Sequence, residues 1–191
     1  PYVVARSTTD NVRVPPVTDA FGTEIGGDIK YAVTPNLTAD LTVNTDFAQV
    51  EIDEQQVNLT RFNLFLPEKR DFFLEGRGLF DFGRGGSSSG GFGGGGTSDQ
   101  PYLFYSRRIG LNRGRVVPID VGGRLTGKIG AFGVGVMNIQ AGDETTSGSP
   151  ATNFTVVRAK RDILRRSTVG AIFTNRNESS VTAGGTNQAF G

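Results

Sequence analysis

The chain has 191 residues, of which 20 are basic and 19 acidic, and it contains no cysteine and no histidine. This composition excludes disulfides, thiolate metal sites and histidine-based acid–base or metal chemistry, and the near-neutral charge gives no reason to expect a nucleic acid partner. No apolar run in the sequence approaches the roughly 20 residues that a membrane-spanning helix needs.

The first predicted elements are β-strands. Residues 1–6 lack the basic start and long apolar run of a signal peptide, and residues 1–5 form a possible first strand. Over residues 28–33 apolar and polar side chains alternate strictly, and the alternation resumes over residues 37–44 after a turn at Thr34-Pro35-Asn36. This pattern predicts two antiparallel strands with one apolar and one polar face.

Two more strand pairs follow towards the C-terminus. Residues 118–141 alternate on both sides of a short turn near Gly130-Ala131. Residues 153–161 and 167–175 form the last pair, joined by residues 162–166. Alternation is poorer in this pair, where Arg158 and Lys160 would share a face. A further strand is possible at residues 102–109.

The connections between these strands differ greatly in length. Three turns are tight, whereas residues 142–150 form a long polar loop and residues 45–101 form a larger excursion, a possible plug or loop. The excursion includes a Gly/Ser tract at residues 83–98, which cannot bury enough apolar surface to offset its ordering entropy and is predicted to be a flexible loop. The remaining glycines, of 28 in total, are scattered through the predicted strands. Short turns on one rim and long loops on the other are typical of outer-membrane barrels.

The fold class that these patterns predict is all-β: an antiparallel meander that forms part of a transmembrane outer-membrane β-barrel. The polar faces carry charged side chains in mid-strand, which suits a water-filled lumen, and the opposite faces carry mostly Ala, Gly, Val and Leu. A soluble β-sandwich would show the same alternation, and the absence of tryptophan counts against a conventional aromatic girdle. The mid-strand charges are Lys30, Asp40, Arg124, Lys128, Arg158 and Lys160.

Several blocks of the sequence resemble a known family. They span residues 27–38, 46–53, 56–62, 65–76, 103–110 and 161–176, and the most specific reads Pro67-Glu-Lys-Arg-Asp-Phe-Phe-Leu-Glu-Gly76. With these blocks the chain resembles large bacterial outer-membrane proteins that carry a carbohydrate-binding family 9-like domain ahead of a barrel domain of unknown function. The resemblance implies an upstream sugar-binding domain, absent here, and a barrel of more strands than this chain holds. We therefore expect residues 1–191 to be a single, partial barrel domain, since even the smallest barrels need about 8 strands.

The densest charged and aromatic block offers two interpretations. Glu68, Lys69, Arg70, Asp71 and Glu75 could line a solute path as a constriction or plug inside the lumen. They could instead form an internal ion-pair cluster that holds the long excursion against the barrel wall. We favour the second interpretation, because charge clusters usually pair for architecture.

Other charged groups give weaker signals. Asp46, Glu51, Asp53 and Glu54 could bind Ca²⁺ through oxygen ligands, but their spacing matches no EF-hand loop and favours a polar strand face. Nothing in that spacing singles out a carboxylate pair for glycosidic cleavage. The doublets Arg107-Arg108 and Arg165-Arg166 could meet lipid headgroups or anionic solutes, although a solvated rim is the simpler interpretation. We expect no catalytic residue, no metal site and no cofactor.

The function that follows is passive. We expect a barrel segment in the bacterial outer membrane whose parent passes or receives solutes at the cell surface, with saccharides suggested by the resemblance. The expected partners are outer-membrane lipid and saccharides or other small solutes, with no nucleic acid. One alternative is a surface anchor or interaction protein whose barrel is plugged by residues 45–101. Another is a carbohydrate-active enzyme, for which Glu68, Asp71 and Glu75 would be the carboxylates to test.

Overall fold

The computed structural model of the chain describes residues 2–10, 17–45, 68–82, 103–112, 115–145, 148–164, 167–178 and 184–191. Strands dominate this part of the chain, and the helices in it are single turns. Within it, no helix is both long enough and apolar enough to cross a membrane.

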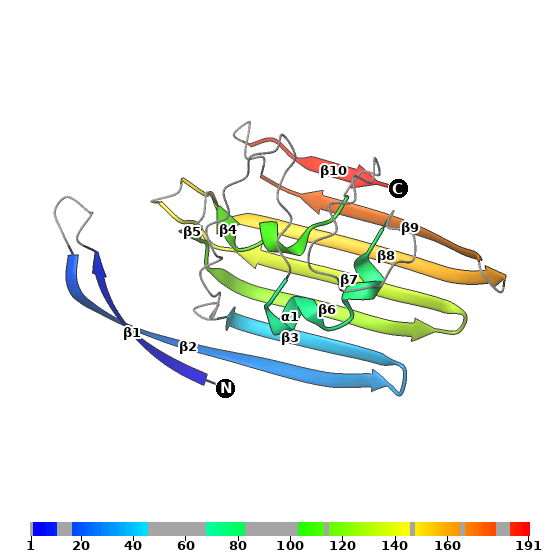
Figure 1. Cartoon of the computed structure of the whole chain (residues 1–191), viewed down its shortest axis with the longest axis horizontal. Coiled ribbons are helices and arrows are strands. Elements are labelled where there is room, and N and C mark those ends of the chain that lie inside the picture. The colour runs from blue at the N-terminus through cyan, green and yellow to red at the C-terminus, as the bar shows by residue number, and fades with distance from the viewer. Residues whose placement is uncertain are drawn as a thin grey trace, which may run out of the picture.

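Eight strands form one antiparallel sheet in the order β1-β2-β3-β6-β7-β8-β9-β10 (Figure 1). Their bounds are β1 Tyr2–Asp10, β2 Val17–Thr34, β3 Leu37–Thr45, β6 Ile119–Ile129, β7 Phe132–Ala141, β8 Thr152–Leu164, β9 Ser167–Arg176 and β10 Asn187–Phe190. Two short strands, β4 Leu111–Asn112 and β5 Arg115–Val116, pair with each other. In the described residues β1 and β10 are the edges, and the sheet is open.

The all-β antiparallel meander predicted from the sequence is confirmed, and so are its three hairpins and the first strand. The possible strand at residues 102–109 is wrong. Residues 103–105 have no regular structure, and a 3₁₀ turn, η1 Ser106–Arg108, follows them. The reason is tertiary: Ile109 is buried against the sheet and Leu103 and Phe104 pack beside it, so the segment lies on the sheet instead of joining its edge.

The tight turn between β2 and β3 shows how closely the chain packs at this rim. The backbone N–H of Lys128, on β6, donates to the carbonyl oxygen of Asn36 in the turn at 2.8 Å. A Cβ atom on the neighbouring Gly127 would lie 2.0 Å from that same oxygen, so only glycine fits there.

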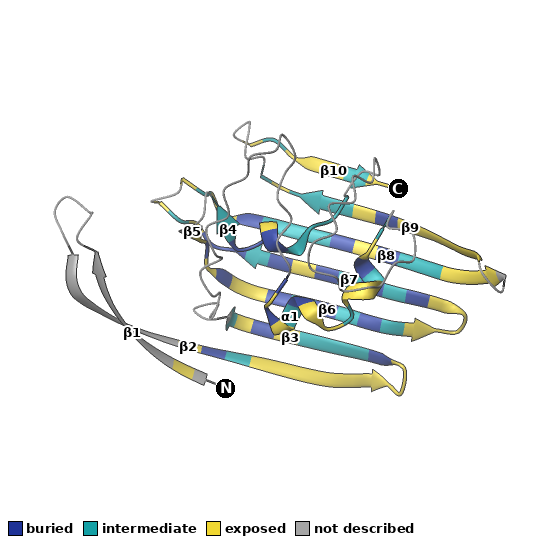
Figure 2. Cartoon of the chain, in the orientation of Figure 1, coloured by how far each residue is buried: buried dark blue, intermediate teal, exposed yellow. Residues whose placement is uncertain are grey.

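One face of the sheet is apolar and exposed, and we call it the apolar face. Along β6 and β7, buried residues alternate with more exposed ones (Figure 2). On this face one cross-strand row from β2 to β10 is entirely apolar, and its ends, Tyr31 and Phe190, are 67% and 83% exposed. The row consists of Tyr31, Ala39, Leu125, Val136, Val157, Phe173 and Phe190.

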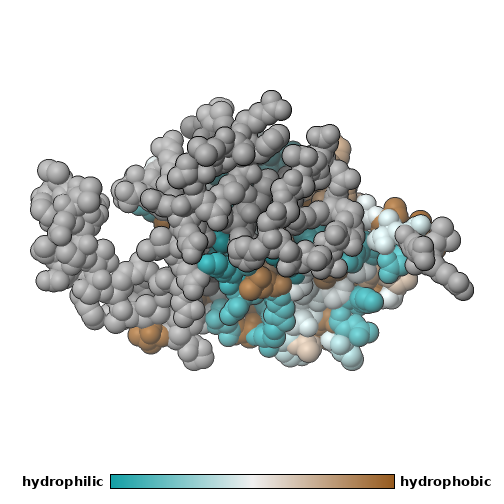
Figure 3. Space-filling view, in the orientation of Figure 1, coloured by the Kyte–Doolittle hydropathy of each residue, from teal (hydrophilic) through white to brown (hydrophobic). Residues whose placement is uncertain are grey.

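The opposite face, which we call the polar face, carries all six mid-strand charges predicted from the sequence, because the strand register places them on one side. Residues 68–82 and 103–112, together the docked segment, lie over this face. They include α1 Asp71–Leu74, α2 Arg77–Phe80 and η1 (Figure 1). Hydrophilic residues gather on this side around α1 and β3 (Figure 3).

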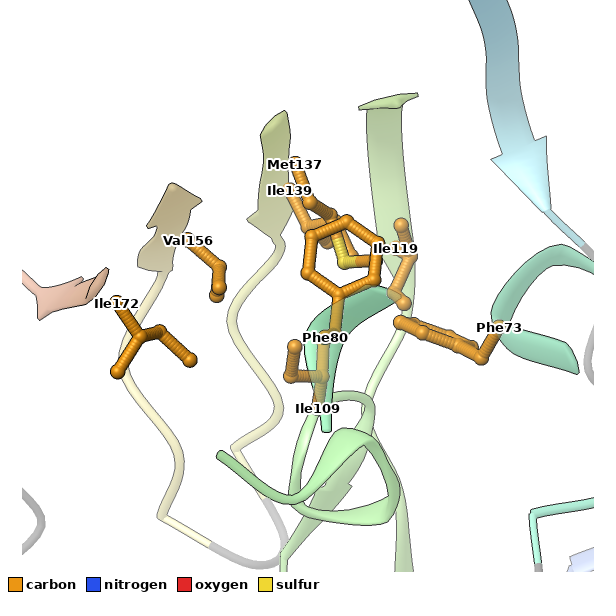
Figure 4. Close-up of a cluster of buried hydrophobic side chains, with 8 residues drawn as sticks. All are labelled: Phe73, Phe80, Ile109, Ile119, Met137, Ile139, Val156 and Ile172. Carbon is orange, nitrogen blue, oxygen red and sulfur yellow. The ribbon is translucent and has the colours of Figure 1, made fainter. Parts of the chain in front are cut away.

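The apolar core lies between the docked segment and the polar face. Phe80 points into a group formed by Ile119, Met137 and Ile139 of the sheet, and Phe73 and Ile109 close it from the docked side (Figure 4). Val156 and Ile172 extend the cluster across β8 and β9. The docked segment is thus held by burial of aromatic side chains and not merely by charge.

Candidate functional site

The interface between the docked segment and the polar face is the most organised site in the described structure, and glycine makes it possible. A Cβ on Gly135 would lie 3.0 Å from the Phe80 ring, and one on Gly133 would lie 3.2 Å from Leu79 Cδ2. Both glycines are on β7 and their missing side chains leave room for α2. Sequence reasoning missed this role, although glycines spaced two apart within a strand signal the close approach of another segment.

A third glycine of this kind, Gly122, lies beneath α1. A Cβ on Gly122 would lie 2.9 Å from Thr42 Cγ2 and 3.5 Å from the Phe72 ring. The rings of Phe72 and Phe73 meet edge to face with centroids 5.2 Å apart, so α1 presents an aromatic pair to the sheet.

A buried ion pair lies inside the docked segment. Arg70 Nε and Nη2 donate to the two carboxylate oxygens of Glu68 at 2.7 and 2.8 Å, and the two side chains are only 6% and 3% exposed. The Ser106 hydroxyl donates to Glu68 Oε2 at 2.6 Å. Bidentate geometry of this kind is strong and directional.

Arg70 also joins the two halves of the docked segment. Its Nη1 donates to the carbonyl oxygen of Ile109 at 2.6 Å and its Nη2 to that of Ser106 at 2.9 Å. The guanidinium carbon lies 4.1 Å from the centroid of the Phe73 ring, so the charge also stacks on an aromatic face. Residues about 40 positions apart are therefore fixed to one another by a single side chain.

The pKa of Glu68 is set by two opposing effects. Burial by itself raises the pKa, but the hydrogen bonds and charge of Arg70, with the Ser106 hydrogen bond, outweigh it and hold the pKa below the ordinary value of 4.5. Glu68 is therefore an ionised structural carboxylate, whereas a general acid in glycoside hydrolysis needs a raised pKa.

A second charged network joins the docked segment to the sheet through Arg124 on β6. Its Nη2 lies 2.6 Å from Asp40 Oδ2 and 3.1 Å from Glu75 Oε2, and its side chain is 1% exposed. Nη1 donates to the backbone carbonyl oxygens of Phe72 and Glu75. The two carboxylates thus compensate the buried positive charge of Arg124, and the same guanidinium caps the C-terminal end of α1.

Lys30 completes this network from the side of β2. Its Nζ pairs with the Glu75 carboxylate and lies 3.9 Å from Asp40 Oδ1. Both Lys30 and Glu75 are about half exposed, at 53% and 51%. The hydrogen bond from Lys30, then its charge and that of Arg124, hold the pKa of Glu75 below 4.5, although burial opposes them.

The remaining sequence-predicted residues do not belong to these two clusters. Lys69, Asp71 and Lys128 are exposed. Arg158 is buried, donates from Nη1 to Ala171 O at 3.0 Å, and lies over the Phe82 ring. The Nζ of Lys160 lies 3.4 Å from Gly78 O, and so also contacts the docked segment.

The arginine doublets separate in the structure. Arg107 is buried, so the expected solvated rim is wrong for this residue, whereas Arg108 is exposed. The difference arises because η1 turns one side chain towards the interior and the next away from it. Arg165 and Arg166 lie outside the described residues.

Asp46, Glu51, Asp53 and Glu54, for which a polar strand face was favoured over a Ca²⁺ site, also lie outside the described residues, as does the Gly/Ser tract. Among the residues that the structure does describe, no group of three or more acidic side chains is placed to hold a metal ion.

Comparison with known proteins gives one match. A family described as "Domain of unknown function (DUF5916)" matches residues 1–118 of the 191-residue chain, which include β1 to β3 and the whole docked segment and end directly before β6. No curated protein and no solved structure matches the chain. Because the match covers more than half of its length, the chain belongs to this family, whose function is unknown.

Proposed function

We propose that this chain forms part of a bacterial outer-membrane β-barrel in which the docked segment is a plug, so that the barrel is closed at rest and serves as a surface anchor. The observation that carries the proposal is the contrast between the two faces of one sheet. The apolar face is exposed, whereas the charged polar face is covered by a segment of the same chain.

The apolar face has the chemistry that lipid requires. A soluble sheet would cover such a face, because contiguous apolar surface of this extent is costly in water. β6, β7 and β9 are 11, 10 and 10 residues long, which matches the roughly 9–11 residues that a tilted strand needs to cross a bilayer.

The apolar zone also shifts along neighbouring strands. At one cross-strand level Val43 and Val121 on β3 and β6 are apolar, while their neighbours Gln140 and Asn153 on β7 and β8 are polar. Strands in membrane barrels tilt by about 35–45°, so a layer of constant depth crosses successive strands at shifting residues. The step in the apolar zone fits such a tilt.

Hydrogen-bonded amides border the apolar zone at the long-loop end. Asn138 Nδ2 donates to Asn153 Oδ1 at 2.9 Å and to Thr155 Oγ1 at 2.8 Å, and Asn153 Nδ2 donates to Gln140 Oε1 at 3.2 Å. These side chains satisfy one another, which suits the boundary between hydrocarbon and headgroups.

Membrane placement can be tested with spin labels, because the chain has no cysteine and a label reacts only with one that is introduced. A spin label would be attached to Val157→Cys on the apolar face, and to Asp143→Cys in the β7–β8 loop as the matched control. In native outer membrane we expect the label at position 157 to collide often with oxygen and rarely with a water-soluble nickel complex, and the label at 143 to show the reverse. Equal access of the nickel complex to both positions, or a soluble native polypeptide, contradicts the proposal.

A gated solute path is the second candidate, and one observation favours it. The half-exposed Lys30–Glu75 pair and the Arg124 network join the docked segment to the sheet partly through polar contacts, which rearrange more readily than an apolar core. The family resemblance to proteins with an upstream carbohydrate-binding family 9-like domain suggests saccharides as the solutes.

Single-channel conductance of the full polypeptide that carries this sequence separates the two candidates. A plugged anchor conducts no ions in a planar bilayer, and added saccharides leave the conductance at zero. A gated path opens in discrete steps when the solute is added. Steady open-pore conductance without any solute contradicts both candidates.

A further inference from the structure

A cavity of about 240 Å³ lies between the docked segment and the polar face, away from both charged clusters. It sits at the long-loop end of the sheet, where β7 ends, β8 begins and β9 ends. The residues that line it and bear on its chemistry are Arg108, Asn112, Ser149, Thr152, Phe154 and Arg176.

Two arginines face this cavity from segments far apart in the sequence. Arg108 closes η1 and is exposed, and Arg176 is the last residue of β9. Both side chains line the same cavity, so their like charges repel each other there. Folding thus brings two positive charges to one small cavity, an arrangement that is unfavourable unless an anion joins them.

Arg108 and Arg176 differ from Arg70 and Arg124, each of which pairs with a carboxylate. Within the described part of the chain, no carboxylate lies within ion-pair distance of either guanidinium. The buried Nε of Arg176 makes no hydrogen bond, and its guanidinium carbon lies 5.3 Å from the centroid of the Phe154 ring. Glu178, two residues beyond Arg176, accepts a hydrogen bond from the Gly184 backbone N–H at 3.2 Å.

The geometry points to a binding site for a small solute that carries an oxyanion, either a phosphate or a carboxylate group, held between Arg108 and Arg176. A guanidinium presents paired N–H donors that match the oxygens of such groups. Asn112 and Ser149 add polar groups to the wall, and Phe154 supplies an apolar surface for the rest of the solute. The inference does not depend on the membrane proposal, because it rests on the cavity alone.

The test is titration calorimetry on the full polypeptide that carries this sequence, at low ionic strength. The probes are inorganic phosphate, glucuronate and, as the neutral counterpart of glucuronate, glucose. We expect at least one anion to bind, with phosphate favoured if the natural solute is a phosphate ester and glucuronate favoured if it is an acidic sugar. Glucose should not bind in this cavity, and affinity for the anion should fall as salt is added.

Two variants and a matched control locate the binding. Arg108→Gln and Arg176→Gln should each weaken anion binding by about 10- to 100-fold, the loss expected for hydrogen bonds to a charged group. Arg161→Gln is the control, because Arg161 also lies over a phenylalanine ring, that of Phe132, at 5.2 Å but faces away from the cavity. It should bind anions as the unmodified protein does.

Arg108 is exposed, so its replacement is not expected to disturb folding, and the test stays decisive even if the Arg176 variant folds poorly. The inference is overturned if neither anion binds. It is also overturned if glucose binds as tightly as glucuronate, or if the folded Arg108→Gln protein keeps the affinity of the unmodified one.

Discussion

The two faces of the sheet place different requirements on their side chains, although they are built from alternate residues of the same strands. The apolar face carries side chains that are exposed and make few specific contacts, such as Tyr31 and Phe190. The polar face carries glycines that fit single rings of the docked segment and charges that have named partners, such as Arg124 with Asp40. On the apolar face only the polarity of a side chain matters. On the polar face the shape of the side chain and its bonding partners matter as well.

This difference teaches how one alternating pattern serves two environments. A face that meets a fluid solvent tolerates any side chain of suitable polarity. A face that meets a folded segment requires complementary volume, because protein interiors are close-packed. Substitutions of equal size should therefore have unequal effects on the two faces, and the following experiments measure that inequality.

The largest effect is expected beneath the docked segment, at the buried ion pair. Arg70→Met leaves Glu68 buried without its main partner and should lower the free energy of unfolding by about 3–5 kcal/mol. Urea unfolding in lipid vesicles measures the change. The double variant Glu68→Gln, Arg70→Met removes both charges and should recover part of the loss. A loss below about 1 kcal/mol in the single variant would mean that the pair is not buried in solution.

The next largest effect tests the apolar face. Val157→Lys should cost about 2–4 kcal/mol if this face meets the middle of the bilayer, because a charge there loses its hydration. The same urea experiment measures it, with Asp143→Lys in the exposed loop as a control that should change little. If both substitutions have equally small effects, the apolar face meets water or a hydrated partner. That result would contradict the claim that the apolar face meets lipid.

A pair of glycine substitutions compares the faces directly. Gly135→Val introduces atoms against the Phe80 ring, where even a Cβ would lie at 3.0 Å, and overpacking of this kind should cost about 1–3 kcal/mol. Gly123→Val is the matched control on the apolar face, where a Cβ would meet nothing within 4 Å. It should be neutral or slightly stabilising, because valine favours strands. Equal costs at both positions would contradict the shape requirement of the polar face.

The smallest effect concerns the half-exposed contact between Lys30 and Glu75. Exposed pairs contribute about 0–1 kcal/mol after screening by water and salt, so Glu75→Gln should destabilise the protein only slightly at pH 7. The pKa values of Glu68 and Glu75 are both below 4.5 in the folded protein. Their contribution is therefore present above about pH 4.5 and is lost as the pH falls through the lowered values.

Unfolding free energies measured between pH 7 and pH 3 check this direction, and Glu68→Gln should flatten the profile more than Glu75→Gln because Glu68 is the more buried of the two. Stability that rises on acidification would show that these carboxylates are not ionised partners of the neighbouring cations.

The sequence predicted the hairpins because strand alternation and tight turns are local signals. Residues 28–44 show this well, since the alternation on both sides of Pro35-Asn36 fixes both the strands and their faces. The segment at residues 103–109 was predicted wrongly because its apolar side chains serve packing against the sheet, which no local pattern records. The charged residues of the site could be named from the sequence, but their hydrogen-bond and ion-pair partners could not. Ser106 is the partner of Glu68 from 38 residues away, and only the fold brings them together.

The glycines are the most instructive omission. Gly133 and Gly135 weaken the strand signal of β7, although they are the residues that admit α2. Their spacing was visible in the sequence, but its meaning depends on a segment more than fifty residues earlier, Arg77–Phe80.

The docked segment belongs to the connection between two adjacent strands: Thr45 of β3 pairs with Ile119 of β6, and everything between them leaves and returns at the same rim. Its docking is therefore an intramolecular equilibrium, governed by an effective concentration that the chain itself sets and not by the amount of protein present. A displaced docked segment stays tethered at both ends, so its rebinding to the polar face always competes with the binding of a ligand there. A ligand that replaced the docked segment would have to bind the polar face more tightly than the tethered segment does. Only a strong or multivalent ligand would meet this requirement.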